Sequence, residues 1–196
     1  MITDEIIALA RQQGILRADD VRALGGSRTT LPYLARRGIL RRVAPGAYML
    51  ADRICERGDF VEVAAAVPHG VFCLLSALQF HELTTQMPNE VWMAIERGRH
   101  VPRLRSLPIR IVKLGGASFS SGIQEETEVR MPIRVYSPAK TVVDCFKFRN
   151  KIGLEVAIEA LNDSLAQHKA TRDDIWQLAG VCRMKKVMRP YLEMAR

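Results

Sequence analysis

Glycines divide the N-terminal part of this chain into short segments, and this spacing limits what it can form. Gly14, Gly25 and Gly38 each follow a stretch whose apolar residues recur at helical spacing, and glycine readily ends a helix in the left-handed conformation. The sequence therefore predicts a helix before Gly14, a short second helix before Gly25, and a third helix that Ser27 caps and that ends with Arg37.

The third predicted helix has an apolar face and a basic face. At 100° per residue, Leu31, Leu34 and Ala35 lie on one side, where they can pack on the first two helices. The opposite side carries a hydroxyl group, an aromatic ring and guanidinium groups, from Thr29, Tyr33, Arg36 and, at its edge, Arg37. Pro32 is unusual here because it removes a backbone donor and crowds the preceding turn. It predicts that the helix begins later than Ser27 or is distorted at its beginning.

Two short apolar segments follow Gly38. The stretches "ILRRV" and "AYMLA" are separated by Ala44, Pro45 and Gly46, which predicts a β-hairpin. Three short helices and a hairpin make the order of a winged helix-turn-helix, whose third helix enters the major groove of DNA. Arginine suits this task, because its planar fork pairs with two acceptors on guanine or with phosphate oxygens.

Positive charge is concentrated in this region. The chain has 29 Lys and Arg against 21 Asp and Glu, for a formal charge of +8. Between Val21 and Ala51 there are six arginines and no acidic residue, so this segment carries +6 of that charge. The six are Arg22, Arg28, Arg36, Arg37, Arg41 and Arg42. Such a distribution favours a polyanionic partner, although arginines also occur on ordinary solvated helix faces.

Beyond Asp52 the chain predicts a mixture of helices and strands. Two apolar segments favour helices and three alternating segments favour strands: residues 60–68 and 71–83, and residues 90–96, 109–114 and 129–137. Further helices are expected after the Ser137–Pro138 pair, around residues 154–165, after a capping box of Thr171 and Asp174, and in a C-terminal segment interrupted by Pro190. The predicted fold is α+β, with a winged helix-turn-helix domain over residues 1–52 and a larger mixed α+β domain with a helical C-terminal end over residues 53–196.

Several common kinds of site have no signature in the sequence. The cysteines have no CxxC spacing and no histidine at zinc-finger spacing, so they predict buried, reduced thiols; they are Cys55, Cys73, Cys145 and Cys182. No phosphate-binding GxxxxGK[ST] or GxGxxG loop occurs. The start does not resemble a secretory signal, and no apolar stretch reaches the roughly 18 residues of a membrane span. We expect a soluble, cytoplasmic protein without metal or cofactor.

Three pairs of residues deserve comparison with catalytic groups. They are His81 with Glu82, Glu90 with Glu96, and Lys140 with Asp144. The first pair lacks a second metal ligand, because Thr85 stands in its place. The two glutamates near a predicted strand are a weak signal for a nuclease-like acid pair. The third pair, four residues apart on a helix, is expected to be a surface ion pair. We expect no catalytic residue and no enzyme activity.

Three stretches together resemble the AbiEi-type antitoxins, which are transcriptional regulators of bacterial abortive-infection systems for viral defence. The stretches are residues 14–50, 70–95 and 134–161, and "SPAKTVVDCFKFRNKIG" is the most distinctive part. The resemblance implies a winged helix that binds inverted repeats in the protein's own promoter and a C-terminal antitoxin domain. It also implies a nucleotidyltransferase-like toxin as functional partner in a type IV toxin–antitoxin pair. The antitoxin counteracts the effect of this toxin without needing to bind it directly.

Carried over to this sequence, the DNA-binding role falls on the third helix and the hairpin. The residues are Arg28, Thr29, Thr30, Tyr33, Arg36 and Arg37 in the helix and Arg41 and Arg42 in the hairpin. We therefore expect a sequence-specific autorepressor of double-stranded DNA that self-associates on its operator. The alternatives are a stand-alone regulator, a protein-interaction module and a nuclease-like enzyme. The interaction module would use an apolar C-terminal stripe, although its helical spacing favours core packing over docking; the stripe is formed by Met184, Val187, Met188, Tyr191 and Leu192.

Overall fold

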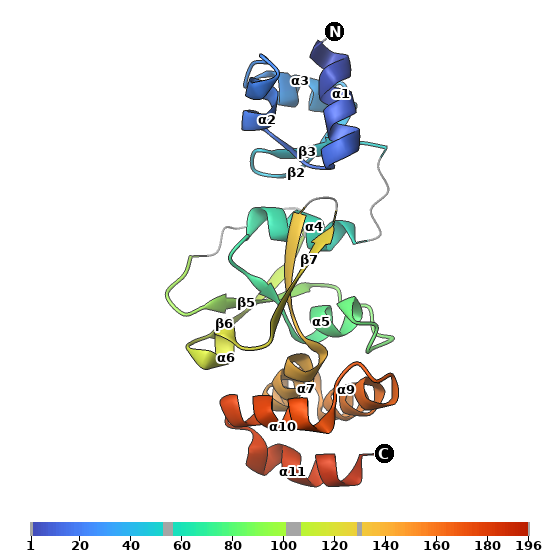
Figure 1. Cartoon of the computed structure of the whole chain (residues 1–196), viewed down its shortest axis with the longest axis vertical. Helices are drawn as coiled ribbons and strands as arrows, with labels where there is room; N and C mark the ends of the chain where they lie inside the picture. The colour runs from blue at the N-terminus through green and yellow to red at the C-terminus, as the bar shows by residue number, and fades with distance from the viewer. Residues whose placement is uncertain (1, 53–56, 101–106, 129–130, 196) are drawn as a thin grey trace. The chain divides into compact units, whose positions relative to one another are not determined.

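The computed structural model describes residues 2–52, 57–100, 107–128 and 131–195. Helices and two β-sheets make up this part of the chain, which confirms the predicted α+β class (Figure 1). The chain divides into two compact units. The N-terminal unit comprises Met1–Pro68 and Glu126–Ile133, and the C-terminal unit comprises His69–Glu125 and Arg134–Arg196. Cys55 lies outside the described residues.

The N-terminal unit combines short helices with a three-stranded antiparallel sheet. Its elements are α1 (Ile2–Gln13), β1 (Leu16–Arg17), α2 (Ala18–Ala23), α3 (Thr30–Arg36), β2 (Leu40–Ala44), β3 (Ala47–Leu50) and α4 (Gly58–Ala66). The strand order is β1-β3-β2, so β2 forms one edge. Leu40 pairs with Leu50 and Arg42 with Tyr48, and a bulge interrupts the register between Arg42 and Ala44.

One apolar cluster joins the first three helices to this sheet. Its buried members are Ile6, Ala10, Leu16, Val21, Leu31, Leu34, Leu40, Tyr48 and Leu50. Successive strand residues face opposite sides of a sheet, so Met49 lies on the side away from Leu50, and it is fully buried as well. Since α4 also contacts β2, both faces of the sheet are covered.

The C-terminal unit is built on a mixed five-stranded sheet of order β6-β5-β4-β8-β7. Its elements are β4 (Val71–Phe72), α5 (Leu74–Phe80), β5 (Val91–Glu96), β6 (Ile109–Leu114), α6 (Ala117–Ser120), β7 (Ile123–Glu128), β8 (Met131–Tyr136), α7 (Pro138–Lys147), α8 (Arg149–Ile152), α9 (Leu154–Ala166), α10 (Arg172–Val181) and α11 (Lys185–Met194). β5 runs antiparallel to β4 and parallel to β6. Residues 126–133 of β7 and β8 belong to the N-terminal unit.

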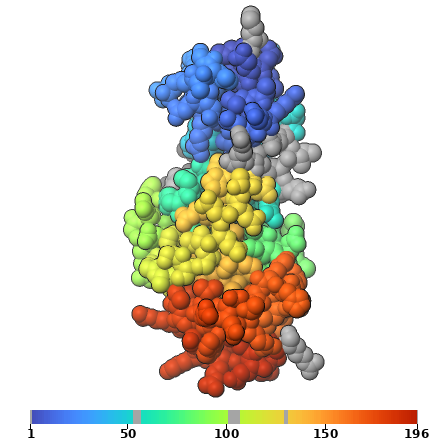
Figure 2. All heavy atoms as spheres, viewed as in Figure 1, coloured from blue at the N-terminus to red at the C-terminus, as the bar shows by residue number. Residues whose placement is uncertain are grey.

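Helix α7 is the centre of the C-terminal core. Every residue from Pro138 to Phe146 is buried, and the helix contacts α5, α9, α10 and α11. The space-filling view shows the orange and red segment that contains α9, α10 and α11 as one continuous packed mass (Figure 2). The sequence signals for α7 are confirmed, since Ser137 caps the helix by accepting a hydrogen bond from the Lys140 amide and Pro138 occupies its first turn.

The Lys140–Asp144 pair corrects the sequence analysis, which placed it on the surface. The Lys140 ammonium and the Asp144 carboxylate are 2.5 Å apart, and the two side chains are 0% and 1% exposed. The ammonium also lies 4.0 Å from the centre of the Tyr136 ring. Burial raises the pKa of Asp144, while the Lys140 charge opposes this rise. The spacing correctly indicated contact, but it contains no information on burial.

Three further differences concern secondary structure. Val71 and Phe72, expected in a helix, form β4 because they pair with β5 and β8. β7 was not predicted, since its sequence IQEETE is largely exposed and has no apolar alternation. Helix α11 continues through Pro190, whose side chain lies exposed, so the predicted interruption is wrong. The predicted strands at 90–96 and 109–114 are confirmed as β5 and β6, and the Thr171 capping box as the start of α10.

We predict that Asp144→Asn lowers the free energy of unfolding by about 3–5 kcal/mol, because it leaves a buried ammonium without its counter-charge. The double variant Lys140→Met, Asp144→Leu should lose less unfolding free energy than either Lys140→Met or Asp144→Leu alone. The control is Glu193→Gln, which breaks the exposed i,i+4 pair with Arg189 and should cost about 1 kcal/mol or less. Urea denaturation measures the stability of these variants; equal small losses for Asp144→Asn and Glu193→Gln would show that the buried pair contributes no more than an exposed one.

Candidate nucleic-acid interface

The start of α3 resolves the question that Pro32 raised. The helix begins at Thr30 with Thr29 as its N-cap residue, so Pro32 is its third residue. The first four N–H groups of a helix have no acceptor within it, and a proline there loses no helical hydrogen bond. Ser27, predicted as the cap, instead starts the preceding turn: its carbonyl accepts from the Thr30 amide at 3.0 Å and its hydroxyl from the Thr29 amide at 3.3 Å.

The end of α3 is fixed by a Schellman motif. The Ile39 amide donates to the Leu34 carbonyl and the Gly38 amide to the Ala35 carbonyl, both at 3.1 Å. Gly38 has a φ of 72°, the left-handed conformation that this motif requires at its position. The motif ends the helix one residue before the predicted Arg37 and leads the chain directly into β2.

Burial of one side of α3 determines which residues face solvent. Leu31 and Leu34 are 2% and 0% exposed, as the helical wheel predicted. The predicted DNA-binding residues of this segment are exposed, except that Thr30 is partly exposed; they are Arg28, Thr29, Thr30, Tyr33, Arg36 and Arg37. We call this surface the basic face of α3. Tyr33, at 51%, is among the exposed large apolar side chains, and its hydroxyl accepts a hydrogen bond from Arg37 at 3.2 Å.

Most charges on this face are not neutralised by the protein. Among the described residues, no carboxylate lies within 4.0 Å of the guanidinium groups of Arg28, Arg36 or Arg37. Arg22 differs, because it pairs with Asp19 at 2.5 Å and contributes less to the field around α3. A field from unpaired guanidinium groups attracts anions, and Tyr33 adds a ring and a hydroxyl group.

The two hairpin arginines do not lie on one surface. They are consecutive in β2, so their side chains leave opposite faces of the sheet. Arg41 pairs with Met49 and is partly exposed, whereas Arg42 pairs with Tyr48 on the helix side. Arg42 Nε donates to the Ala44 carbonyl at 3.3 Å, which holds the side chain along its own strand. Arg42 is therefore the hairpin arginine on the same side of the sheet as α3.

The residue pairs compared with catalytic groups do not form catalytic arrangements. His81 Nε2 lies 2.7 Å from the Tyr136 carbonyl oxygen. Glu90 precedes β5 and pairs with Arg110 at 2.7 Å, whereas Glu96 ends β5; the length of the strand therefore separates the two carboxylates. In the part of the chain that the structure describes, no group of three His, Cys, Asp or Glu could hold a metal ion, and no helix is long and apolar enough to cross a membrane.

The described cysteines are free and buried, as predicted: Cys73, Cys145 and Cys182. Burial raises the pKa of each thiol, which keeps it protonated and a poor nucleophile. The buried, reduced state predicted for these three cysteines is therefore confirmed.

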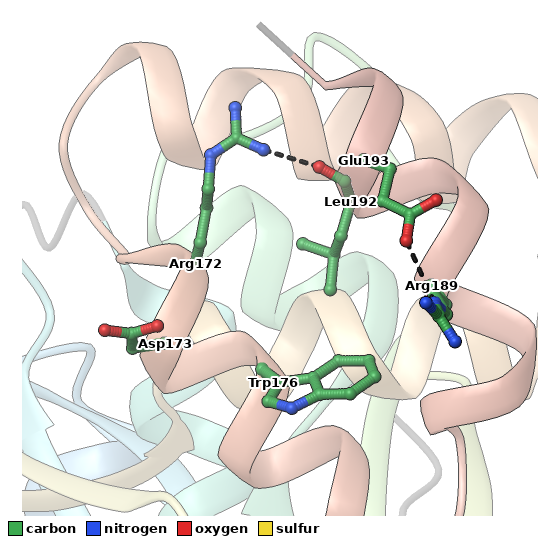
Figure 3. A pocket seen from close by; sticks show the side chains of 6 residues that line it. All are labelled: Arg172, Asp173, Trp176, Arg189, Leu192 and Glu193. Carbon is green, nitrogen blue, oxygen red and sulfur yellow. Dashed lines mark hydrogen bonds and ion pairs between the residues drawn. The ribbon is translucent and has the colours of Figure 1, made fainter.

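The two arginines that line a concavity between α10 and α11 have partners within the unit. Arg172 reaches from α10 to the Leu192 carbonyl at 2.5 Å, and Arg189 pairs with Glu193 at 2.9 Å (Figure 3). Trp176, which also lines the concavity, is 36% exposed, and the Lys185 ammonium lies 4.8 Å from the centre of its ring.

Three members of the apolar C-terminal stripe are buried and the other two pack against the core. This favours the core-packing interpretation of that stripe.

Comparisons with known proteins support the N-terminal assignment. Residues 4–51 match the model of a family described as "Transcriptional regulator, AbiEi antitoxin", which confirms the family resemblance in this segment. The comparison with curated proteins gives no match. The crystal structure of the RV2827C protein from Mycobacterium tuberculosis is similar with a TM-score of 0.68 and 11% identity, over 97% of this chain and 77% of that one. At this identity the likeness shows a shared fold.

We predict that Gly38→Ala destabilises the protein by about 1–2 kcal/mol, because a Cβ is unfavourable at positive φ. The Cβ itself would meet nothing within 4 Å, so the effect is purely conformational. Gly58→Ala is the matched control in the same unit: its Cβ is equally unobstructed and its φ lies outside the left-handed region, so it should be neutral or slightly stabilising. Thermal unfolding compares the two, and equal stability of both variants would contradict the role of Gly38.

Proposed function

We propose that this chain, whose residues 4–51 match the AbiEi antitoxin family of transcriptional regulators, binds operator DNA in its own promoter and represses it. The DNA-binding domain is residues 1–52, a winged helix-turn-helix, and residues 53–196 form the antitoxin domain. The target is double-stranded DNA with inverted repeats, on which two copies of the chain associate.

The observation that carries this proposal is the basic face of α3. Leu31 and Leu34 are buried on one side, and guanidinium groups without carboxylate partners among the described residues occupy the other. A helix presented in this way fits the major groove, where arginine can pair with guanine O6 and N7. Phosphate contacts from the same face would add affinity without specificity.

The order of elements supports the same function. Helices α2 and α3 follow one another through a short turn, and β2 and β3 form a hairpin directly after α3. This order is the one expected of a winged helix, whose hairpin would touch the DNA backbone beside the groove. Arg42 is the hairpin residue that we assign to that contact, because it lies on the α3 side of the sheet; Arg41 would contribute through the longer-range field.

The proposed antitoxin function rests on the match of residues 4–51 to the AbiEi antitoxin family. The functional partner is a nucleotidyltransferase-like toxin encoded beside this chain, and neutralisation belongs to the C-terminal domain. No residue of that domain is assigned this task from geometry alone.

We predict that Arg36→Ala weakens binding to the DNA upstream of the gene by about 1–3 kcal/mol and weakens binding to scrambled DNA much less, because a base contact is lost. Arg42→Ala should weaken both about equally, as the loss of a phosphate contact does. Fluorescence anisotropy at two salt concentrations measures these affinities, which should all fall as salt rises.

The control is Arg189→Ala, which removes the same charge from α11 and should leave both affinities unchanged. Equal losses on operator and scrambled DNA for Arg36→Ala would show that α3 supplies only electrostatic attraction.

For the antitoxin half, we predict that the product of the neighbouring gene arrests growth when expressed alone and that coexpression of this chain restores growth. Arg36→Ala, expressed from an unrelated promoter, should restore growth equally well, because α3 belongs to the DNA-binding domain. Growth curves under separate inducers measure this. An absence of toxicity, or of rescue, would leave a stand-alone regulator as the function.

A further inference from the structure

A pocket of about 800 Å³ opens at one edge of the C-terminal sheet. Strands β5 and β6 are parallel, with Glu96 opposite Leu114, so their carboxyl ends meet at this edge. Arg97 directly follows β5, and Gly115 directly follows β6. Ligands of open α/β sheets bind outside the carboxyl ends of the strands, and the volume is in the range of small-molecule sites.

Four cationic side chains from four parts of the unit line this pocket: Arg97, Lys113, Lys147 and Arg183. None of its lining residues is acidic, and no carboxylate among the described residues lies within 4.0 Å of these four groups. Three other arginines of the unit pair with carboxylates: Arg99 with Glu96, Arg110 with Glu90 and Arg189 with Glu193. Arg134, Arg149 and Arg172 donate to backbone carbonyl groups instead. The pocket is therefore a place where four cations without a carboxylate partner among the described residues line one cavity.

The backbone at Arg183 is in the left-handed conformation, as it also is at Glu82 and His168, which follow the ends of α5 and α9. Arg183 has a φ of 59° and follows the C-terminus of α10, where the Met184 amide donates to the Ala179 carbonyl at 2.7 Å. Glycine is the usual residue at such a position, and a side chain there is conformationally unfavourable. A cation near a helix C-terminus gains some energy from the helix dipole, but any arginine or lysine in the last turn would gain this without strain.

The remaining lining groups suit a ligand with an aromatic part. Leu114 and Cys182 are buried and form an apolar floor, and Phe148 is the aromatic side chain of the lining, half-buried in the wall. Nucleobases stack on such rings, while guanidinium and ammonium groups bind phosphate oxygens. The pocket thus offers both an anion site and an apolar surface.

We propose that this pocket binds a nucleoside triphosphate, with the phosphates between Arg97, Lys113, Lys147 and Arg183 and the base against Phe148. The charge of the four cations complements a triphosphate better than a monophosphate. The site lies wholly within the C-terminal unit, so it is separate from the DNA interface and does not depend on the proposed repressor function.

The test is isothermal titration of the DNA-free full chain with ATP and GTP, and with AMP and inorganic triphosphate. We expect saturable binding of ATP or GTP and weaker binding of AMP, which lacks two phosphates, and of triphosphate, which lacks the base. Lys113→Gln should weaken nucleotide binding about tenfold, as the loss of a charge-assisted contact does. Lys186→Gln, an exposed lysine outside the pocket, is the matched control and should have no effect.

Arg183→Gly separates binding from folding. This variant removes the guanidinium group and also relieves the positive φ, so we expect a higher Tm together with binding about tenfold weaker. Arg36→Ala should bind nucleotide as the unaltered chain does, which distinguishes this site from the DNA interface.

Three results would overturn the proposal. They are an absence of saturable ATP or GTP binding, equal weakening by Lys113→Gln and Lys186→Gln, and inorganic triphosphate binding as tightly as the nucleotides. Displacement of ATP by an oligoribonucleotide that binds more tightly through the same residues would assign the pocket to RNA instead.

Discussion

The burial of Leu31 and Leu34 is the contact on which the proposed DNA-binding surface depends. These side chains join α3 to α1, α2 and the sheet in one apolar cluster, and full burial of each leucine contributes roughly 1.5–3 kcal/mol. Because a helix is rigid, fixing one side fixes the direction of the other. The arginines of α3 are therefore displayed by buried residues, and a substitution in the leucines would disturb the proposed binding surface without removing any charged group.

Much of the N-terminal unit could be predicted because its signals are local. The apolar spacing of α3, the glycine after it and the Pro45–Gly46 turn each act within a few residues, and the structure places the expected side chains in solvent. Pro32 indicated that α3 begins later than Ser27 or is distorted, and the later start is confirmed. Its exact first residue could not be predicted, because Ser27 and Thr29 are both good capping residues and only the preceding turn decides between them. The two-residue strand β1 was also missed, since its formation depends on pairing with Tyr48 and Ala47.

In the C-terminal unit the decisive features are non-local. The spacing of Lys140 and Asp144 indicates a contact, but their burial follows from helices that pack around α7 from distant parts of the chain. The cationic pocket likewise unites residues from β5, β6, α7 and the end of α10, which no sequence window contains.

Because β2 lies at the edge of its sheet, Arg41 and Arg42 also have a second effect. An edge strand exposes unpaired backbone groups that can accept a strand from another molecule, and charged side chains on such a strand discourage this. The arginines thus protect the hairpin from edge-to-edge aggregation whether or not DNA is bound. Removing both arginines would change the solubility of the protein as well as its charge. The solubility of such a variant must therefore be measured before a change in its DNA affinity is interpreted.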